Sequence, residues 1–278
     1  MDVADLEIEG DGIPMELITL YHDDPIVVKR ATDIAKPIGA AKDTALFYVH
    51  GGGWSAGARD AFHPHLEHFS KLGYWCASVG YRLAPGAKWH EQLADIMDGY
   101  DRFIRYLEQS GAEIRKIVVL GSSAGAHLVS LLAQMGPEDA ARVGSTLRLT
   151  GPWRKPDACV SINGPGTLEL WPDMNEEIKT SIEKVIGASY EDTTDKFALA
   201  SPDRYVKEGG PDFLFLVVEH EKYFPHEYVY RMSKQIQELG GTSEVVYFAD
   251  AQHGFFYGVS SAMQKKAMAV LEPFVAGL

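Results

Sequence analysis

The sequence predicts an α/β domain in which helices cover both faces of a mostly parallel, twisted sheet. Apolar runs rich in β-branched and aromatic residues alternate with helical patterns through most of the 278 residues. Two of these runs, IVVL at 117–120 and FLFLVV at 213–218, are apolar at every position, which is typical of parallel strands buried on both faces. The length suits a single domain of this class.

Seven segments are predicted to form strands and six to form helices. The strands are 15–21, 44–49, 74–79, 116–120, 158–162, 213–218 and 244–248. The helices lie near 60–72, 90–109, 124–135, 175–186, 226–239 and 260–275. Where two neighbouring parallel strands are joined through a helix, the crossover is expected to be right-handed.

Two stretches do not fit this alternation. Residues 136–157 are rich in Gly, Pro and charge, and we interpret them as a surface excursion. Residues 164–211 are long for a connection, and long connections in compact domains are often lids or binding loops. We therefore predict one domain over 1–278, with a lid-like insertion at about 164–211 that covers one end of the sheet.

The charge balance excludes some classes of partner. There are 26 Lys and Arg against 39 Asp and Glu, a formal net charge of -13. This balance argues against nucleic acid, whose binding depends on clustered cations, and against a polybasic membrane anchor. The two cysteines, Cys76 and Cys159, lie in apolar runs and are expected to be core thiols, not disulfide or metal ligands.

The first ten residues, MDVADLEIEG, lack the basic start and apolar core of a secretory signal. No stretch approaches the 18 apolar residues of a membrane-spanning helix. We therefore expect a cytoplasmic protein without a membrane span, although a leader removed from the chain would leave no trace in this sequence.

A short motif, Gly121-Ser122-Ser123-Ala124-Gly125, follows one predicted strand directly and precedes a predicted helix. A nucleophilic serine needs such a sharp strand-to-helix turn, which pushes its hydroxyl out of the backbone, together with small neighbours. The N-terminus of the helix adds partial positive charge where negative charge develops. Ser123 is therefore the candidate nucleophile, and a simple Gly-rich turn is the alternative.

A second motif, HGGGW at 50–54, follows the strand predicted at 44–49. Consecutive glycines leave the backbone bare and free in φ, so that several N–H groups can point inward together. An oxyanion hole requires two or three such donors around the oxygen that gains charge, whereas a flexible turn would require none. The expected donors are the N–H groups of Gly52, Gly53 and Ala124, with that of Trp54 as a substitute for one glycine.

The chain has ten histidines, so position must identify a catalytic base. His253 follows the last predicted strand and precedes the last helix, from where it can reach the strand ends and accept a proton from Ser123. His127 lies inside the helix that follows Ser123, and His50 is expected to brace the glycine loop. His253 is therefore the candidate base.

Three further histidines, His63, His65 and His68, crowd the segment HPHLEH. Their spacing could suggest a metal site, but no carboxylate-rich partner set accompanies them. We favour a solvated helix face over a metal site and expect no metal ligand here.

The acid of a catalytic triad should come between the serine and the histidine in the sequence. After the strand at 213–218 the chain offers Glu219 and Glu221, and a carboxylate here would hold the imidazole of His253 in the correct tautomer. We choose Glu221, with Glu219 as the rival and Asp250 as an outside candidate. The order serine, acid, histidine is that of α/β-hydrolases.

Taken together, these motifs resemble α/β-hydrolase esterases of the BD-FAE and hormone-sensitive-lipase-like groups, where BD-FAE denotes bifunctional acetyl- and feruloyl esterases. The resemblance covers roughly residues 40–275 and includes YRLAP at 81–85 with its following Asp95, Ser201-Pro202, and the late His253-Gly254. It implies an α/β-hydrolase fold. It also implies Ser123 as nucleophile, His253 as base, Glu221 as acid, and Gly52, Gly53 and Ala124 as oxyanion donors.

The chain departs from the family pattern in two places. The family usually shows a His-Gly pair at the end of the seventh strand and then an Asp, whereas here Val217-Val218 replace the pair and Glu221 stands where the Asp would. The segment before residue 44 is short, with little room for the helical cap of hormone-sensitive-lipase relatives. This favours the BD-FAE and arylformamidase side of the superfamily.

We therefore predict a serine carboxylic-ester hydrolase that acts on short-acyl or aryl esters and needs no cofactor. The alternatives are an arylformamidase, which would use the same residues on an amide, and a non-catalytic binding protein on the same fold. The expected partner is a small-molecule ester, and a homodimer is left open. Six aromatic side chains are candidates to line the substrate pocket, with core packing as the alternative for each: Trp54, Tyr81, Trp171, Tyr223, Phe255 and Phe256.

Overall fold

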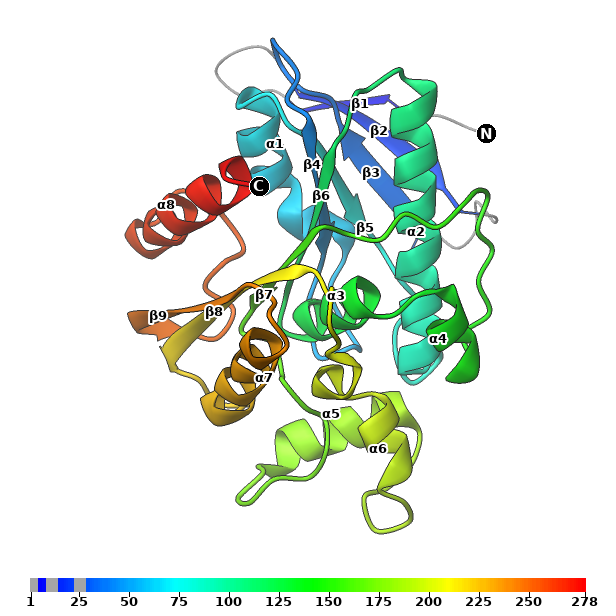
Figure 1. Ribbon diagram of the computed structural model, residues 1–278, viewed down its shortest axis with the longest axis vertical. Helices are drawn as coiled ribbons and strands as arrows, with labels where there is room; N and C mark the ends of the chain where they lie inside the picture. Colours follow the sequence, from blue (N-terminus) through cyan, green and yellow to red (C-terminus); the bar gives the residue numbers. More distant parts are fainter. Residues whose placement is uncertain (1–4, 9–14, 23–28) are drawn as a thin grey trace.

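A twisted nine-stranded sheet runs through the computed structural model, which describes residues 5–8, 15–22 and 29–278 (Figure 1). Its strand order is β1-β2-β3-β5-β4-β6-β7-β8-β9. From β5 to β9 in this order all neighbours are parallel, whereas β1, β2 and β3 are joined antiparallel. The strands are Asp5–Ile8 (β1), Met15–Tyr21 (β2), Ala31–Ala35 (β3), Thr44–Val49 (β4), Trp75–Val79 (β5), Lys116–Ser122 (β6), Ala158–Ile162 (β7), Asp212–His220 (β8) and Ser243–Gln252 (β9).

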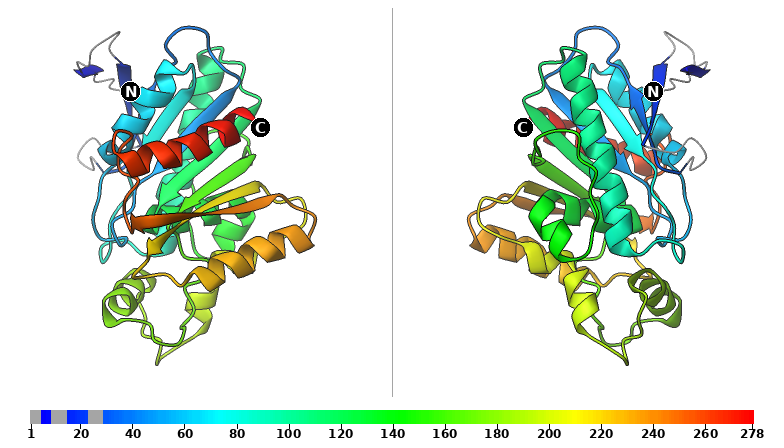
Figure 2. Two further views of the ribbon diagram at one scale, coloured as in Figure 1. Left: turned by 90° about the vertical axis from the view of Figure 1, so that its left-hand side faces the viewer. Right: turned by 90° about the vertical axis from the view of Figure 1, so that its right-hand side faces the viewer.

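Helices cover both faces of this sheet, which confirms the predicted fold class (Figure 2). Helices α2, α3 and α7 pack on one face, and α1 and α8 pack on the other. The helices are His63–Lys71 (α1), Trp89–Gln109 (α2), Ala124–Gln134 (α3), Pro137–Arg142 (α4), Glu176–Ile186 (α5), Asp195–Leu199 (α6), His226–Glu238 (α7) and Ala262–Ala276 (α8). Two 3-10 turns lie at Arg59–Phe62 (η1) and Pro202–Tyr205 (η2).

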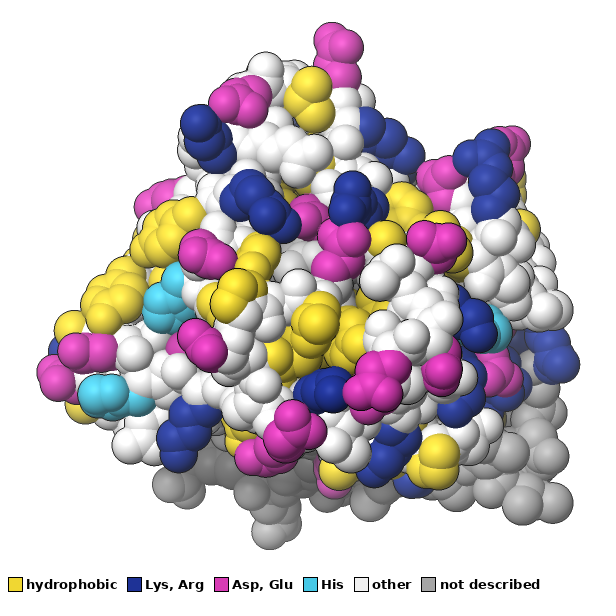
Figure 3. Space-filling model, turned by 90° about the horizontal axis from the view of Figure 1, so that it is seen from below, with side chains coloured by type: hydrophobic (Ala, Val, Ile, Leu, Met, Phe, Trp, Pro, Cys, Tyr) yellow, Lys and Arg dark blue, Asp and Glu magenta, His cyan; other side chains and the backbone are white. Residues whose placement is uncertain are grey.

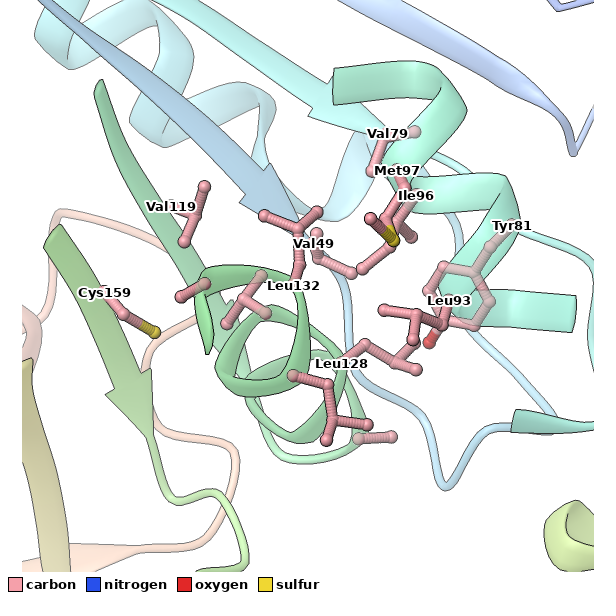
Figure 4. Packing of buried hydrophobic residues seen from close by; sticks show 14 of the residues in the cluster. Val49, Val79, Tyr81, Leu93, Ile96, Met97, Val119, Leu128, Leu132 and Cys159 are labelled. Carbon is pink, nitrogen blue, oxygen red and sulfur yellow. The ribbon is translucent and has the colours of Figure 1, made fainter. Parts of the chain in front are cut away.

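Successive side chains of a central strand enter opposite halves of the core, because side chains of a β-strand alternate between the two faces. Phe47 and Val49 of β4 pack with α2 and α3, whereas Leu46 and Tyr48 pack with α1 and α8. Figure 4 shows Val49 beside side chains of both covering helices, including Leu128 of α3. The sheet is therefore fixed from both sides, which holds the loops at its carboxyl end on a rigid support.

Strands β1 and β3 were not predicted. Strand β3 has the sequence ATDIA. Its polar Thr and Asp interrupt the apolar pattern, although the strand is buried at every position. The carboxylate of Asp33 tolerates burial because it has partners: Thr19 donates a hydrogen bond to it at 2.7 Å, and Arg59 forms an ion pair with it at 2.8 Å. A pattern of apolar residues alone does not detect a strand whose buried carboxylate is paired from neighbouring elements.

The segment 164–211 contains α5, α6 and η2. Helices α5 and α6 lie beyond the carboxyl ends of the parallel strands, and the end of the segment leads back to the start of β8 at Asp212 (Figures 1 and 2). Helix α5 begins at the cap Asn175, whose side chain accepts the N–H of Ile178 at 2.9 Å, and ends at Gly187 with φ of 76°. The segment 136–157 includes the short helix α4, which the sequence did not predict. It buries Ala140 against the main core.

Both cysteines are free thiols in the core, as predicted. In the described residues, no helix combines the length and the apolar character that crossing a bilayer requires.

Candidate active site

Ser123 lies on a sharp turn between β6 and α3. Its φ of 54° and ψ of -120° are outside the regions that non-glycine residues usually adopt, and its N–H donates to the carbonyl oxygen of Ile162 at 2.8 Å. The small neighbours are required by the turn, because a Cβ atom at Gly121 would collide with the carbonyl of Gly125. One at Gly125 would collide with the carbonyl of Val49. The turn thus exposes the hydroxyl at the carboxyl end of the sheet.

Three side chains from distant parts of the chain form a continuous hydrogen-bonded series here. Nε2 of His253 lies 2.8 Å from Oγ of Ser123, and Nδ1 of His253 lies 2.8 Å from Oε2 of Glu221. The side chains of His253 and Glu221 are 14% and 6% exposed, so the series is shielded from water. With Nδ1–H donated to the carboxylate, Nε2 is left to accept the serine proton.

The structure distinguishes between the three candidate acids. Glu221 directly follows β8, and its second oxygen, Oε1, accepts the N–H groups of Lys222 at 3.0 Å and Tyr223 at 2.9 Å. Glu219 is still within the strand, and its carboxylate accepts the N–H of Asp250 at 2.7 Å. The backbone therefore holds Glu221 toward His253 and uses Glu219 to fix the loop that carries Asp250.

The glycine loop passes through three successive residues with positive φ, a conformation that favours glycine. Gly52, Gly53 and Trp54 have φ of 113°, 56° and 58° in succession. The carbonyl of Gly52 points back into the loop and accepts the N–H of Ala56 at 2.9 Å. Within the described residues, no acceptor is seen for the N–H groups of the three predicted oxyanion donors, Gly52, Gly53 and Ala124.

Two buried aromatic residues hold this loop from behind. His50 donates from Nδ1 to the carbonyl of Gly51 at 2.8 Å, and its ring stacks on that of Tyr81 at 4.3 Å. The hydroxyl of Tyr81 donates to the carbonyl of His50 at 2.9 Å. Burial lowers the pKa of His50 to about 4, so the ring is neutral at pH 7. Tyr81 is fully buried and is not among the residues that line the two cavities at Ser123, so the structure does not place it in the predicted substrate pocket.

His127, for which the sequence predicts no role, supports the glycine loop at Trp54. The indole N–H of Trp54 donates to its Nδ1 at 3.1 Å, so Nε2 carries the proton and donates to the carbonyl of Ala200 at 2.7 Å. Burial lowers the pKa of His127 to about 4. The carbonyl of Trp54 accepts the side-chain N–H of Gln92 at 3.0 Å. A histidine one turn into the helix after the nucleophile was the only sequence signal for this contact.

The YRLAP segment is anchored by its following aspartate. Asp95 is fully buried and accepts two hydrogen bonds from the guanidinium of Arg82, at 2.8 and 2.9 Å. The backbone N–H of Ala84 then donates to the carbonyl of Trp54 at 2.9 Å. The segment thus forms part of the support of the glycine loop.

Two cavities meet at Ser123. One has a volume of about 390 Å³ and lies between the glycine loop and the loop of His253. The other has about 290 Å³ and lies between the glycine loop and α5. The first is lined by His50, Gly51, Gly52, Gly53, Gly57, Ala61, Ser123, His253, Gly254 and Tyr257. The second is lined by Gly52, Gly53, Trp54, Ser55, Ser123, Glu177, Ile178, Ser181, Lys184, Tyr223 and Phe224.

The remaining aromatic predictions have mixed outcomes. Trp54 and Tyr223 line the second cavity. Trp171 lines a separate cavity of about 400 Å³, which also contains Glu221 but not Ser123. Phe255 and the fully buried Phe256 lie outside both cavities at Ser123, because their rings pack in the core formed with α8. These two side chains fill the core beneath the histidine loop instead.

The three histidines of HPHLEH do not share one solvated face. His63 contacts Asp33 at 2.9 Å and His68 contacts Glu272 at 2.8 Å, whereas His65 is fully buried. The prediction of a solvated face is therefore wrong for His65, because its ring packs against Phe62 and other aromatic rings in the core. No group of three or more side chains that could hold a metal ion occurs in the described residues.

The face of the molecule that carries α5 and α6 has mixed charge. Figure 3, seen from below, shows Lys and Arg side chains interspersed with Asp and Glu around scattered hydrophobic side chains. On the described part of this face the cations do not gather into a continuous patch of the kind that binds a phosphate backbone.

The sequence and the fold are similar to those of known esterases. The family model described as BD-FAE matches residues 32–236. Esterase LipQ of Mycobacterium tuberculosis is 26% identical over 217 residues, which cover 76% of this chain and 50% of that protein. Arylacetamide deacetylase of Oryctolagus cuniculus is 35% identical over 94 residues, covering 32% of this chain and 24% of that protein. The chain thus spans at most about half the length of these curated relatives.

Solved structures of similar fold include esterase 2 of Thermogutta terrifontis phosphonylated by sarin. That structure has a TM-score of 0.71 at 21% identity and covers 89% of each chain. The propionate-bound form of an esterase from the same organism has a TM-score of 0.68 at 20% identity, covering 99% of this chain and 94% of that one. At this level of identity the likeness shows a shared fold.

Proposed function

The chain belongs to the BD-FAE family of α/β-hydrolase esterases, and from this membership we propose that it hydrolyses carboxylic esters with short acyl or aryl groups. The proposal assigns Ser123 as nucleophile, His253 as base and Glu221 as acid. The observation that carries it is the pair of 2.8 Å contacts through His253, from Oγ of Ser123 to Oε2 of Glu221. This arrangement activates a hydroxyl that is otherwise a weak nucleophile.

In the first step, Oγ of Ser123 attacks the ester carbonyl carbon while its proton passes to Nε2 of His253. The carbonyl oxygen becomes an oxyanion and accepts hydrogen bonds from the N–H groups of Gly52, Gly53 and Ala124. When the intermediate collapses, the bond from carbon to the alcohol oxygen breaks. His253 gives its proton to the leaving alcohol, and an acyl-serine remains.

In the second step, water attacks the acyl carbon and gives one proton to His253. The new oxyanion forms in the same place, and its collapse breaks the bond between the acyl carbon and Oγ of Ser123. The proton on His253 returns to the serine oxygen, and the carboxylic acid is released. Glu221 stays ionised throughout and stabilises the imidazolium that forms twice in each cycle.

The two cavities at Ser123 support small substituents on either side of the carbonyl. Volumes of about 390 and 290 Å³ are at the low end for ligand pockets, which favours short acyl or single-ring groups over long lipid chains. Helix α5 lines one of them, so we propose that the segment 164–211 acts as a lid-like insertion over the site. Esterase 2 of T. terrifontis takes a phosphonyl group from sarin, a reaction typical of serine hydrolases, and has been solved with propionate and butyrate.

A fluorophosphonate probe tests the nucleophile, and a series of p-nitrophenyl esters tests the substrate class. We expect labelling of the wild-type chain, no labelling of Ser123→Ala, and turnover that falls from acetate and butyrate to octanoate. An aryl formamide assayed in parallel would identify an arylformamidase if it were turned over faster than every ester. Absence of labelling, or equal labelling of Ser123→Ala, would instead indicate a binding protein.

A further inference from the structure

Tyr257 joins two loops of the site that the sheet does not join. It lies four residues after His253, and its phenol oxygen accepts the backbone N–H of Gly51 at 3.0 Å. The two residues are 206 positions apart in the sequence. Gly51 follows β4 and the loop of Tyr257 follows β9, and β6, β7 and β8 lie between these strands in the sheet. Backbone pairing alone therefore does not fix the distance between the loops.

The contact is closely fitted. The phenol end of Tyr257 is inserted beside Gly51 and next to the hydroxyl of Ser122, while the residue as a whole is 36% exposed and lines the larger cavity at Ser123. A Cβ atom at position 51 would collide with the phenol oxygen, so the contact also explains why this glycine is needed. The ring packs against Phe62 at 5.5 Å between centroids.

Loss of this hydroxyl would leave the N–H of Gly51 unpaired. Gly51 is buried, and a buried N–H without an acceptor is unfavourable, so the start of the glycine loop would shift to bring this N–H to water. The hydroxyl of Tyr81 still holds the carbonyl of the same peptide, so the displacement would be taken up after Gly51, where Gly52 and Gly53 have no Cβ to resist it. The N–H groups proposed to bind the oxyanion would then be aimed away from Ser123.

We propose that Tyr257 is a positioning residue that holds the glycine loop at a fixed position relative to the loop of His253. This inference rests on the proposed esterase function. The phenol hydroxyl acts through the backbone of Gly51 and leaves the contacts among Ser123, His253 and Glu221 unchanged. Removing it should therefore weaken transition-state stabilisation without altering substrate binding or proton transfer.

The test is Tyr257→Phe, which keeps the ring and removes only the hydroxyl. Rates are normalised to active sites titrated with a fluorophosphonate, so that misfolded molecules do not count. Loss of a whole oxyanion donor costs about 10²–10³ in turnover, and we expect a partial misalignment to lower kcat about 10- to 100-fold with KM within about twofold. The pH profile of kcat/KM should keep its shape, and affinity for a trifluoromethyl ketone, which forms a tetrahedral adduct, should fall in parallel with kcat/KM.

Tyr247→Phe is the matched control, since this tyrosine lies on β9 and is 49% exposed. It should leave kcat unchanged. An unchanged kcat in Tyr257→Phe, a loss confined to KM, or a shifted pH profile would overturn the positioning role. Failure of the wild type itself to label at Ser123 would refute the proposed function instead, so the two failures are distinguishable.

Discussion

Replacing His65 by leucine should stabilise the protein. His65 is fully buried among Tyr48, Phe62 and Phe256, and in the described part of the chain neither ring nitrogen has a hydrogen-bond partner. An unsatisfied buried polar group costs about 1–3 kcal/mol, whereas leucine has a similar volume and no polar atom. We therefore expect His65→Leu to raise the free energy of unfolding by about 1–2 kcal/mol at pH 7.

The difference in unfolding free energy between His65→Leu and the wild type should grow as the pH falls. Burial lowers the pKa of His65 to about 3, against about 6.5 in the unfolded chain. Because the folded value is the lower one, the unfolded state binds a proton first, and stability is lost progressively as the pH falls from about 6.5 toward 3. Between pH 7 and pH 5 this loss amounts to about 2 kcal/mol in the wild type, and the leucine variant does not incur it.

Urea denaturation of both proteins at pH 7 and pH 5 measures these differences. The gap in unfolding free energy should widen by about 2 kcal/mol at the lower pH. His68→Gln is a control in the same helix, because it removes a half-exposed contact with Glu272 and should destabilise by at most about 1 kcal/mol. The reasoning fails if His65→Leu destabilises the protein at pH 7, or if the gap is the same at both pH values.

Three further predictions concern the site. Glu221→Gln should lower kcat for p-nitrophenyl butyrate about 10³- to 10⁴-fold while Glu219→Gln retains most activity, and the opposite result would move the acid to Glu219. Gly125→Ala should lose more than about 3 kcal/mol in urea denaturation or fail to fold, because its Cβ would collide with backbone carbonyls, whereas Gly136→Ala in open space should stay within about 0.5 kcal/mol of the wild type. Ser181→Trp should fill the cavity beneath α5 and raise KM for aryl esters more than for methyl esters, and equal changes for both would show that this cavity holds neither group.

Much of the fold follows from local sequence. Three of the predicted strands, 15–21, 44–49 and 158–162, have the bounds that the structure shows, and strand β8 extends the predicted 213–218 at both ends. These segments are apolar at nearly every position, so burial on both faces is the only arrangement that removes their side chains from water. Strand β3 was missed because its buried Asp33 is paired by residues of other elements.

Aromatic side chains show why a residue type alone does not predict a pocket. Trp54, Tyr81 and Phe255 are all large aromatic side chains, and the structure gives them three different surroundings. Trp54 borders a cavity, Tyr81 is stacked behind the glycine loop, and Phe255 packs in the core formed with α8. Core packing and ligand contact use the same chemistry, so the sequence does not separate them.

The sequence by itself determined three local motifs: a serine on a strand-to-helix turn, a run of glycines after a strand, and a histidine after the last strand. Each depends on neighbouring residues, because φ, ψ and side-chain size decide whether such a turn can form. Only the tertiary structure decided that Glu221 and not Glu219 contacts His253, and that the phenol of Tyr257 binds Gly51. These contacts depend on where β8 ends and on how the loops of non-adjacent strands pack, which are properties of the whole sheet and not of any one segment.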